Sequence, residues 1–183
     1  MTRILSLDDE PEMLPLIGLV LELAGYEHLC TTNNTEALAI LREQQIDLFT
    51  QDILRPDMDG RLFYQTMKAD EELRSIPVLC ISAIFGPANR MTAFIESLAE
   101  YRDDYVAKPF GPEELLRATT RMMKRHDKQI PTDKERVAGH RRLREGSNWS
   151  KKTLDDLYER ITNILNELDV EPGMEGQHNP RWS

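Results

Sequence analysis

The chain has 183 residues, a formal net charge of −9, and 40% hydrophobic against 30% charged residues. At about 150 residues per domain, this length allows one domain with an extension and excludes a barrel of about 250 residues. Two cysteines exclude a disulfide framework, so we expect Cys30 and Cys80 to be buried free thiols. The longest apolar stretch, 14–24, contains a proline, a glycine and a glutamate. It is too short and too polar to span a bilayer, and we expect a cytoplasmic protein.

Charge divides the chain into three blocks. Residues 1–116 carry nine basic and 21 acidic side chains, residues 117–152 carry twelve and four, and residues 153–183 carry two and seven. An acidic body, a basic connector and an acidic end indicate modular construction. The basic block is either a solvated helix end with a linker or a surface for an acidic partner or a nucleic acid.

Short apolar runs alternate with amphipathic segments over the first 125 residues. We expect strands at 2–7, 26–31, 46–52, 76–82 and 103–107. Helices are expected between them at 11–24, 36–44, 61–68 and 88–100, with a further helix from 112 to at least 123. This alternation predicts an α/β fold, a parallel sheet doubly wound with helices on both faces.

Polar side chains stand where the expected strands end. Asp8 and Asp9 follow the first strand, and Asp52, Ser82 and Lys108 end or follow the third, fourth and fifth. Ligands of open α/β sheets bind beyond the carboxyl ends of the strands. The pair Asp8–Asp9 alone is more often a helix cap than a metal site, but five such groups in this order predict a functional site.

The chemistry of these groups suits a divalent cation and a phosphoryl group. Neighbouring carboxylates repel one another, and Mg²⁺ prefers one or two carboxylates together with phosphate oxygens. Asp52 could act as a nucleophile that forms an aspartyl phosphate. Lys108 could bind a phosphoryl oxygen, and the hydroxyl group of Ser82 could donate a hydrogen bond to another. The sequence has no glycine-rich nucleotide motif, which argues against a nucleotide cradle.

Four motifs at these strand ends resemble one known family. LDDEPE (7–12), DILRPDMDG (52–60), ISA (81–83) and YVAKPF (105–110) together resemble the receiver domains of two-component response regulators. The resemblance covers residues 1–126. It implies a flavodoxin-like fold with five parallel strands in the order 2-1-3-4-5, here followed by a C-terminal helical tail.

The resemblance implies a role for each acidic position. Asp52 matches the phosphoacceptor, which receives a phosphoryl group from a sensor histidine kinase or a histidine phosphotransfer protein. Asp8 and Asp9 match the pair that holds Mg²⁺ together with Asp52 and the backbone carbonyl of Leu54. Such a protein is not an enzyme, apart from its own phosphotransfer and a slow autodephosphorylation. We expect the bulky side chains of Leu54 and Ile84 to hinder water and prolong the phosphorylated state; a lifetime of seconds would contradict this.

The resemblance also implies a switch. Ser82 matches the hydroxyl that turns toward the phosphoryl group, and Tyr105 matches the aromatic side chain whose rotamer follows it. Lys108 matches the phosphoryl-binding lysine, and the bond from Lys108 to Pro109 matches one that is usually cis in the family.

The stretch around the fifth strand also resembles receivers that dimerise through the fourth helix, fifth strand and fifth helix. Asp103 and Asp104 could then pair with Arg117 or Arg121 of a symmetry mate. The alternative is ordinary exposed charge, which is worth little.

The last third of the chain is expected to hold a basic linker (127–149), an amphipathic helix (150–169) and a disordered end (170–183) that Trp182 could anchor. Apolar side chains in the helix are spaced three and four residues apart, as in a coiled-coil seam. These are Leu154, Leu157, Ile161, Ile164 and Leu168. The seam could form a homodimer or bind a partner, or it could pack on its own receiver.

The sequence is compatible with two kinds of output. We expect signalling through altered protein–protein interaction with a downstream target, or through dimerisation. The alternative is a DNA-binding transcriptional regulator with a short output region. The tail holds one convincing helix with an acidic surface, whereas a helix-turn-helix needs three helices, so a nucleic acid is expected to be an unlikely partner.

Overall fold

The computed structural model describes residues 1–55, 60–83 and 88–170. Five parallel strands form one sheet in the order β2-β1-β3-β4-β5. They are β1 (Arg3–Leu7), β2 (Glu27–Thr31), β3 (Leu48–Asp52), β4 (Val78–Ala83) and β5 (Asp104–Lys108). The α/β fold and the strand order expected from the sequence are therefore confirmed.

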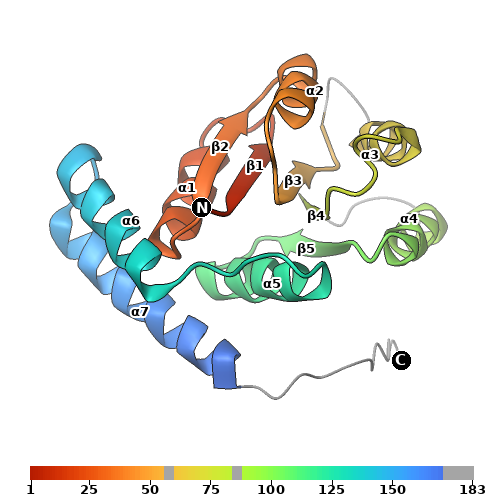
Figure 1. Ribbon diagram of the computed structural model, residues 1–183. Helices are drawn as coiled ribbons and strands as arrows, with labels where there is room; N and C mark the ends of the chain where they lie inside the picture. Colours follow the sequence, from red (N-terminus) through yellow and green to blue (C-terminus); the bar gives the residue numbers. More distant parts are fainter. Residues whose placement is uncertain (56–59, 84–87, 171–183) are drawn as a thin grey trace.

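Helices cover both faces of the sheet (Figure 1). The first five are α1 (Met13–Leu23), α2 (Asn34–Glu43), α3 (Gly60–Ala69), α4 (Ala88–Glu100) and α5 (Pro112–Arg125). Buried side chains of α1 and α5 form one apolar core with one face of the sheet. Those of α2, α3 and α4 form a second core with the other face. Because both faces are covered, β3 is buried at all five positions.

Local signals set several helix ends. The side chain of Asn33 accepts hydrogen bonds from the backbone N–H groups of Thr35 and Glu36 at 2.8 and 3.1 Å, which caps α2. Proline begins α5, where its missing N–H costs no helical hydrogen bond. These polar and proline residues therefore place the helices where the sequence predicts them.

The expected linker is wrong, because residues 133–146 of it form a helix, α6 (Asp133–Gly146). Thr132 and Glu135 make a reciprocal capping box at its start. The helix packs on α1 so closely that a Cβ atom at Gly139 would collide with the carbonyl oxygen of Glu22. Arg136 is buried at this contact. The polar composition that suggested a linker belongs to the outer face of α6.

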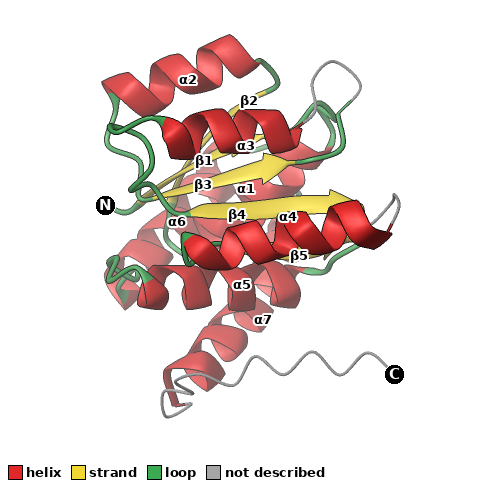
Figure 2. Cartoon of the chain, turned by 90° about the vertical axis from the view of Figure 1, so that its right-hand side faces the viewer, coloured by secondary structure: helices red, strands yellow, loops and turns green. Residues whose placement is uncertain are grey.

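The last helix, α7 (Lys151–Val170), lies on α1, α5 and α6 of its own chain (Figures 1 and 2). The seam packs there and not on a second copy: four of its side chains are buried and the other is partly buried. They are Leu154, Ile161, Ile164 and Leu168, with Leu157 partly buried. The structure therefore shows the alternative in which the helix packs on its own receiver, because α1 and α5 offer an apolar surface that the seam covers.

Other sequence expectations have mixed outcomes. Cys80 is buried, but Cys30 is exposed, because it lies on the edge strand β2. In the described part of the chain no helix is both long and apolar enough to cross a membrane. Ile84 and Trp182, like the expected disorder from residue 171 onward, lie outside the described residues.

Candidate functional site

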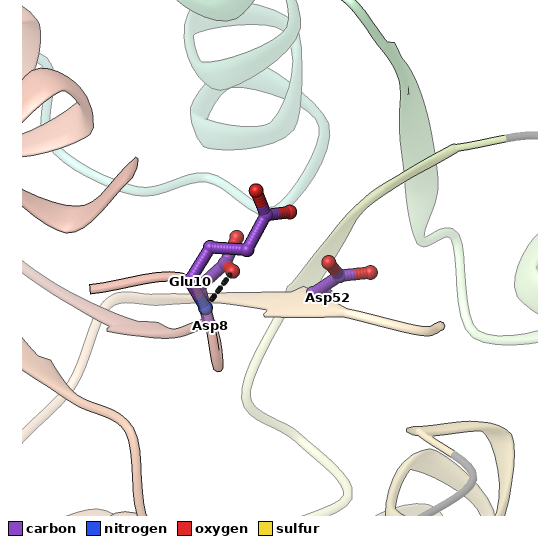
Figure 3. Close-up of side chains that lie close together, drawn as sticks. All are labelled: Asp8, Glu10 and Asp52. Carbon is purple, nitrogen blue, oxygen red and sulfur yellow. Dashed lines mark hydrogen bonds between the residues drawn. The ribbon is translucent and has the colours of Figure 1, made fainter. Parts of the chain in front are cut away.

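Three strands bring the predicted site together at the carboxyl edge of the sheet. Asp52 is the last residue of β3, Asp8 directly follows β1, and Lys108 is the last residue of β5. Strands β1 and β3 are neighbours, with Leu7 opposite Gln51. The carboxylates of Asp8 and Asp52 therefore lie close together (Figure 3).

Lys108 joins the carboxylates. Its Nζ atom donates to Asp52 Oδ2 at 2.7 Å, to Asp8 Oδ2 at 2.9 Å and to Glu10 Oε1 at 3.0 Å. Burial alone would lower the pKa of Lys108, but these three hydrogen bonds together raise it above its usual value. The lysine therefore stays charged at the edge of the sheet.

Asp8 is almost fully buried, and burial raises the pKa of its carboxyl group. Hydrogen bonds from the backbone N–H of Glu10 and from Lys108 oppose that effect, whereas the charge of Asp52 adds to it. A buried carboxylate beside another carboxylate is a group that a bound cation would stabilise.

The acidic cluster differs in membership from the predicted one. The carboxylate oxygens of Asp8, Glu10 and Asp52 lie within 4.8 Å of one another, whereas Asp9 is not part of that group. Within the described ranges, however, Asp9 Oδ1 is buried without a hydrogen-bond partner. The cluster and the unpaired oxygen of Asp9 offer only hard oxygen ligands, and such a set of ligands fits Mg²⁺. Sequence reasoning missed Glu10; its place two residues after Asp8 was the only signal.

The loop after β3 is held against the acceptor position. Asp52 Oδ1 accepts a hydrogen bond from the backbone N–H of Leu54 at 2.9 Å. Gly60 returns to the strand end, where a Cβ atom would lie 2.6 Å from the carbonyl oxygen of Asp52. Arg55, to which the sequence assigned no role, is buried and donates to Asn34 Oδ1 at 2.6 Å. Backbone groups of Leu54 and Gly60 thus hold Asp52 in place.

The predicted switch residues flank the site. Ser82 lies in β4 opposite Ala107, one residue before Lys108. Its hydroxyl group donates to the carbonyl of Ala83 at 3.3 Å, and no hydrogen bond between described residues joins it to Asp52. Tyr105 is partly buried against the core under α3 and α4. The peptide bond between Lys108 and Pro109 is cis.

The charges expected to meet a symmetry mate are paired within the chain. Arg121 binds Asp104 at 2.8 Å. Arg117 binds Glu113 at 3.0 Å and Glu167 of α7 at 3.3 Å. Asp103 is buried, so it faces the interior and not a partner. Within this chain Arg117 and Arg121 therefore already have acidic partners.

Comparison with known proteins identifies the family. The family model described as the response regulator receiver domain matches residues 4–120. The chain belongs to the response regulator receiver domain family. The receiver resembles a Clostridium thermocellum receiver domain protein at a TM-score of 0.59 and 26% identity, over 69% of this chain and 98% of that one. Chemotaxis response regulator CheY4 of Vibrio cholerae shares the fold at a TM-score of 0.58 and 24% identity, over 67% and 98% of the two chains.

Several curated relatives of this receiver are transcriptional regulators by name. The DNA-binding dual master transcriptional regulator RpaA of Synechocystis is 32% identical over 128 residues, which are 70% of this chain and 52% of RpaA. The phosphate regulon transcriptional regulatory protein PhoB of Pseudomonas aeruginosa is 33% identical over 71% of this chain and 56% of PhoB. The chain thus spans about half the length of these relatives. Their names conflict with the expectation that a nucleic acid is an unlikely partner, and that expectation is withdrawn.

Proposed function

We propose that this receiver accepts a phosphoryl group on Asp52 from a phosphohistidine of a sensor kinase or a histidine phosphotransfer protein. The observation that carries the proposal is the position of Asp52. It is buried at the end of β3, its Oδ2 atom lies 2.7 Å from the ammonium of Lys108, and Asp8 lies beside it. A carboxylate held beside a fixed cation is equipped to take up a phosphoryl group.

The transfer is a displacement at phosphorus. An Asp52 oxygen forms the new O–P bond as the P–N bond to the donor imidazole breaks, and the electron pair of that bond leaves with the imidazole. Lys108 then offsets negative charge on the transferred oxygens. Ser82, in the neighbouring strand, has a hydroxyl group that donates to the Ala83 carbonyl and would turn to donate to the same group.

Mg²⁺ would be held by Asp8, Asp9 and Asp52, with the backbone carbonyl of Leu54 as a further ligand. When bound, the ion supplies positive charge that neutralises the carboxylates and the phosphoryl oxygens. The buried Asp8 carboxyl group with its raised pKa and the orphaned Asp9 oxygen support this assignment. Slow autodephosphorylation stays a prediction.

For the output, we propose altered protein–protein interaction carried by the layer of α6 and α7. Helix α5 begins four residues after Lys108, and α7 lies across it. Lys124 of α5 donates to the backbone carbonyl of Leu168 at 3.0 Å, and Arg117 binds Glu167. A rearrangement at Lys108 would therefore reach α7 through α5. Because the seam of α7 is already covered, a homodimer would have to use another surface.

A DNA-binding output is the second candidate, favoured by the names of RpaA and PhoB. Arg141, Lys151 and Lys152 are exposed near the turn between α6 and α7, so phosphate contacts could form there. Measuring DNA binding at increasing salt separates the candidates. A steep fall in affinity supports DNA contacts, and no binding at low salt excludes them.

The phosphorylation proposal is tested with the full chain, Mg²⁺ and acetyl phosphate as phosphodonor. Intact-protein mass should show one added phosphoryl group on the wild type and none on Asp52→Asn. Asp156→Asn, which alters an exposed aspartate of α7, is the matched control and should be labelled like the wild type. Labelling of Asp52→Asn at the wild-type rate would overturn the assignment.

A further inference from the structure

Among the described residues, three carboxylates match the three donors of the Lys108 ammonium group. A lysine offers three N–H groups. The three oxygens within 3.0 Å of Nζ belong to three different carboxylates: Asp52, Asp8 and Glu10. Each donor therefore has its own acceptor in the resting site, and a phosphoryl oxygen can engage Lys108 only when one of these bonds is exchanged.

The three acceptors differ in what else they do. The side chains of Asp8 and Asp52 are nearly inaccessible and lie where a cation and a phosphoryl group would bind. The side chain of Glu10 lies beside Asp8 and Asp52 (Figure 3). It is 58% exposed and forms an ion pair with Lys108 at 3.0 Å. Its backbone N–H donates to Asp8 Oδ1 at 2.9 Å, which fixes where its side chain starts. Glu10 is thus the acceptor that the buried part of the site constrains least.

We propose that Glu10 is a positioning residue that holds Lys108 over Asp52 and is not itself a metal ligand. When Asp8 and Asp52 turn their oxygens toward the cation, two of the three bonds of Lys108 weaken together. The bond to Glu10 remains and keeps the ammonium facing the phosphoryl group. This inference rests on the proposed function of Asp52 and extends it to a residue outside the acidic pair and the acceptor.

The first test measures affinity for beryllofluoride, a phosphoryl mimic, at saturating Mg²⁺ by amide NMR shifts of the full chain. Glu10→Gln should weaken binding about two- to five-fold, the range expected for an ion pair with one exposed partner. Glu10→Asp keeps the charge but is one methylene shorter, and should lose a similar factor. Glu12→Gln, which changes an exposed glutamate on the same segment, should bind like the wild type.

The second test separates lysine positioning from metal binding. Glu10→Gln should change the dissociation constant for Mg²⁺ alone, measured by titration calorimetry, less than about three-fold. Asp9→Asn should change this constant more than about ten-fold, because even the loss of a residue that only hydrogen-bonds to a metal ligand lowers metal affinity by about that factor. A ten-fold loss in Glu10→Gln would make Glu10 a metal ligand and overturn the proposal.

A double-mutant cycle with Lys108→Met asks whether Glu10 acts through the lysine. In the Lys108→Met background, Glu10→Gln should no longer weaken beryllofluoride binding. An equal loss in both backgrounds, or tighter binding by Glu10→Gln in the wild-type background, would contradict positioning. If the wild type itself fails to bind beryllofluoride, or Asp52→Asn binds it equally well, the proposed function fails. If the wild type binds beryllofluoride, Asp52→Asn does not, and the Glu10 variants bind it like the wild type, the inference about Glu10 alone fails.

Discussion

Two lysines at opposite edges of the sheet each bind aspartate, in different surroundings. Lys108 lies at the carboxyl edge with 12% of its side chain exposed and three carboxylates around it. Lys68 lies near the other end of the strands with 3% exposed, and one carboxylate, the fully buried Asp103, 2.8 Å away. Burial lowers the pKa of Lys68 although the charge of Asp103 opposes it. At Lys108 the carboxylates outweigh burial and raise the pKa.

The partners explain the difference. Lys68 also donates hydrogen bonds to the backbone carbonyls of Arg74 and Ile76, at 3.3 and 2.8 Å. Asp103 in turn accepts a hydrogen bond from Tyr64 at 2.9 Å. Loss of any one of these side chains would leave a buried polar group without its partner. Lys108 instead has carboxylate partners that a cation can share. The comparison teaches that a buried lysine stabilises the fold when its partners are fixed, and supports chemistry when they can be exchanged.

The largest effect is expected at the fixed lysine. Lys68→Met leaves Asp103 buried without its cation and should lower the free energy of unfolding by about 3–5 kcal/mol. Urea unfolding of the full chain measures this, with the exposed Lys152→Met as control. Adding Asp103→Asn should restore part of the loss. A change below about 1 kcal/mol would show that the buried pair contributes little to stability, and the contrast between Lys68 and Lys108 would be wrong.

The second-largest loss of stability is expected in α7, if this helix is part of the folded core. Ile161→Ala removes a fully buried side chain from the core shared with α1 and α5. It should lower the unfolding free energy by about 2–4 kcal/mol. Asn163→Ala, at an exposed position of the same helix, should change it little. A small effect at both positions in thermal and urea unfolding would mean that α7 is a detachable tail.

The smallest effect on stability is expected at Asp8, a partner of Lys108. In the absence of Mg²⁺, Asp8→Asn should stabilise the protein by about 0.5–2 kcal/mol at neutral pH, because it removes a buried charge that serves function. Since the folded pKa of Asp8 is raised above 3.8, its ionisation costs stability above that raised pKa. The advantage of asparagine should shrink as pH falls through this range and vanish below 3.8. Thermal unfolding across pH measures it; a destabilising Asp8→Asn would show that Asp8 is held as tightly as Asp103.

The tail shows where sequence reasoning failed. Thr132 and Glu135 form a capping box, a recognisable start signal for α6, yet the basic composition suggested a linker. Whether the charges of α5 pair with a symmetry mate stayed open, because sequence cannot tell a partner within the chain from one outside it. Arg121 reaches Asp104 of the same chain because α5 packs beside β5.

The sequence by itself determined the sheet and its functional edge. Strands that alternate with helices run parallel, so their carboxyl ends lie on one edge, and Asp8, Asp52 and Lys108 share that edge. Only the tertiary structure decided that Glu10 turns to Lys108 and that the seam of α7 covers α1 and α5. An exposed carboxylate can reach several cations, and an apolar stripe can cover any apolar surface. Spacing along the chain determines which side chains lie on the same face of a helix or strand. The partner of that face depends on which surface the fold places opposite it.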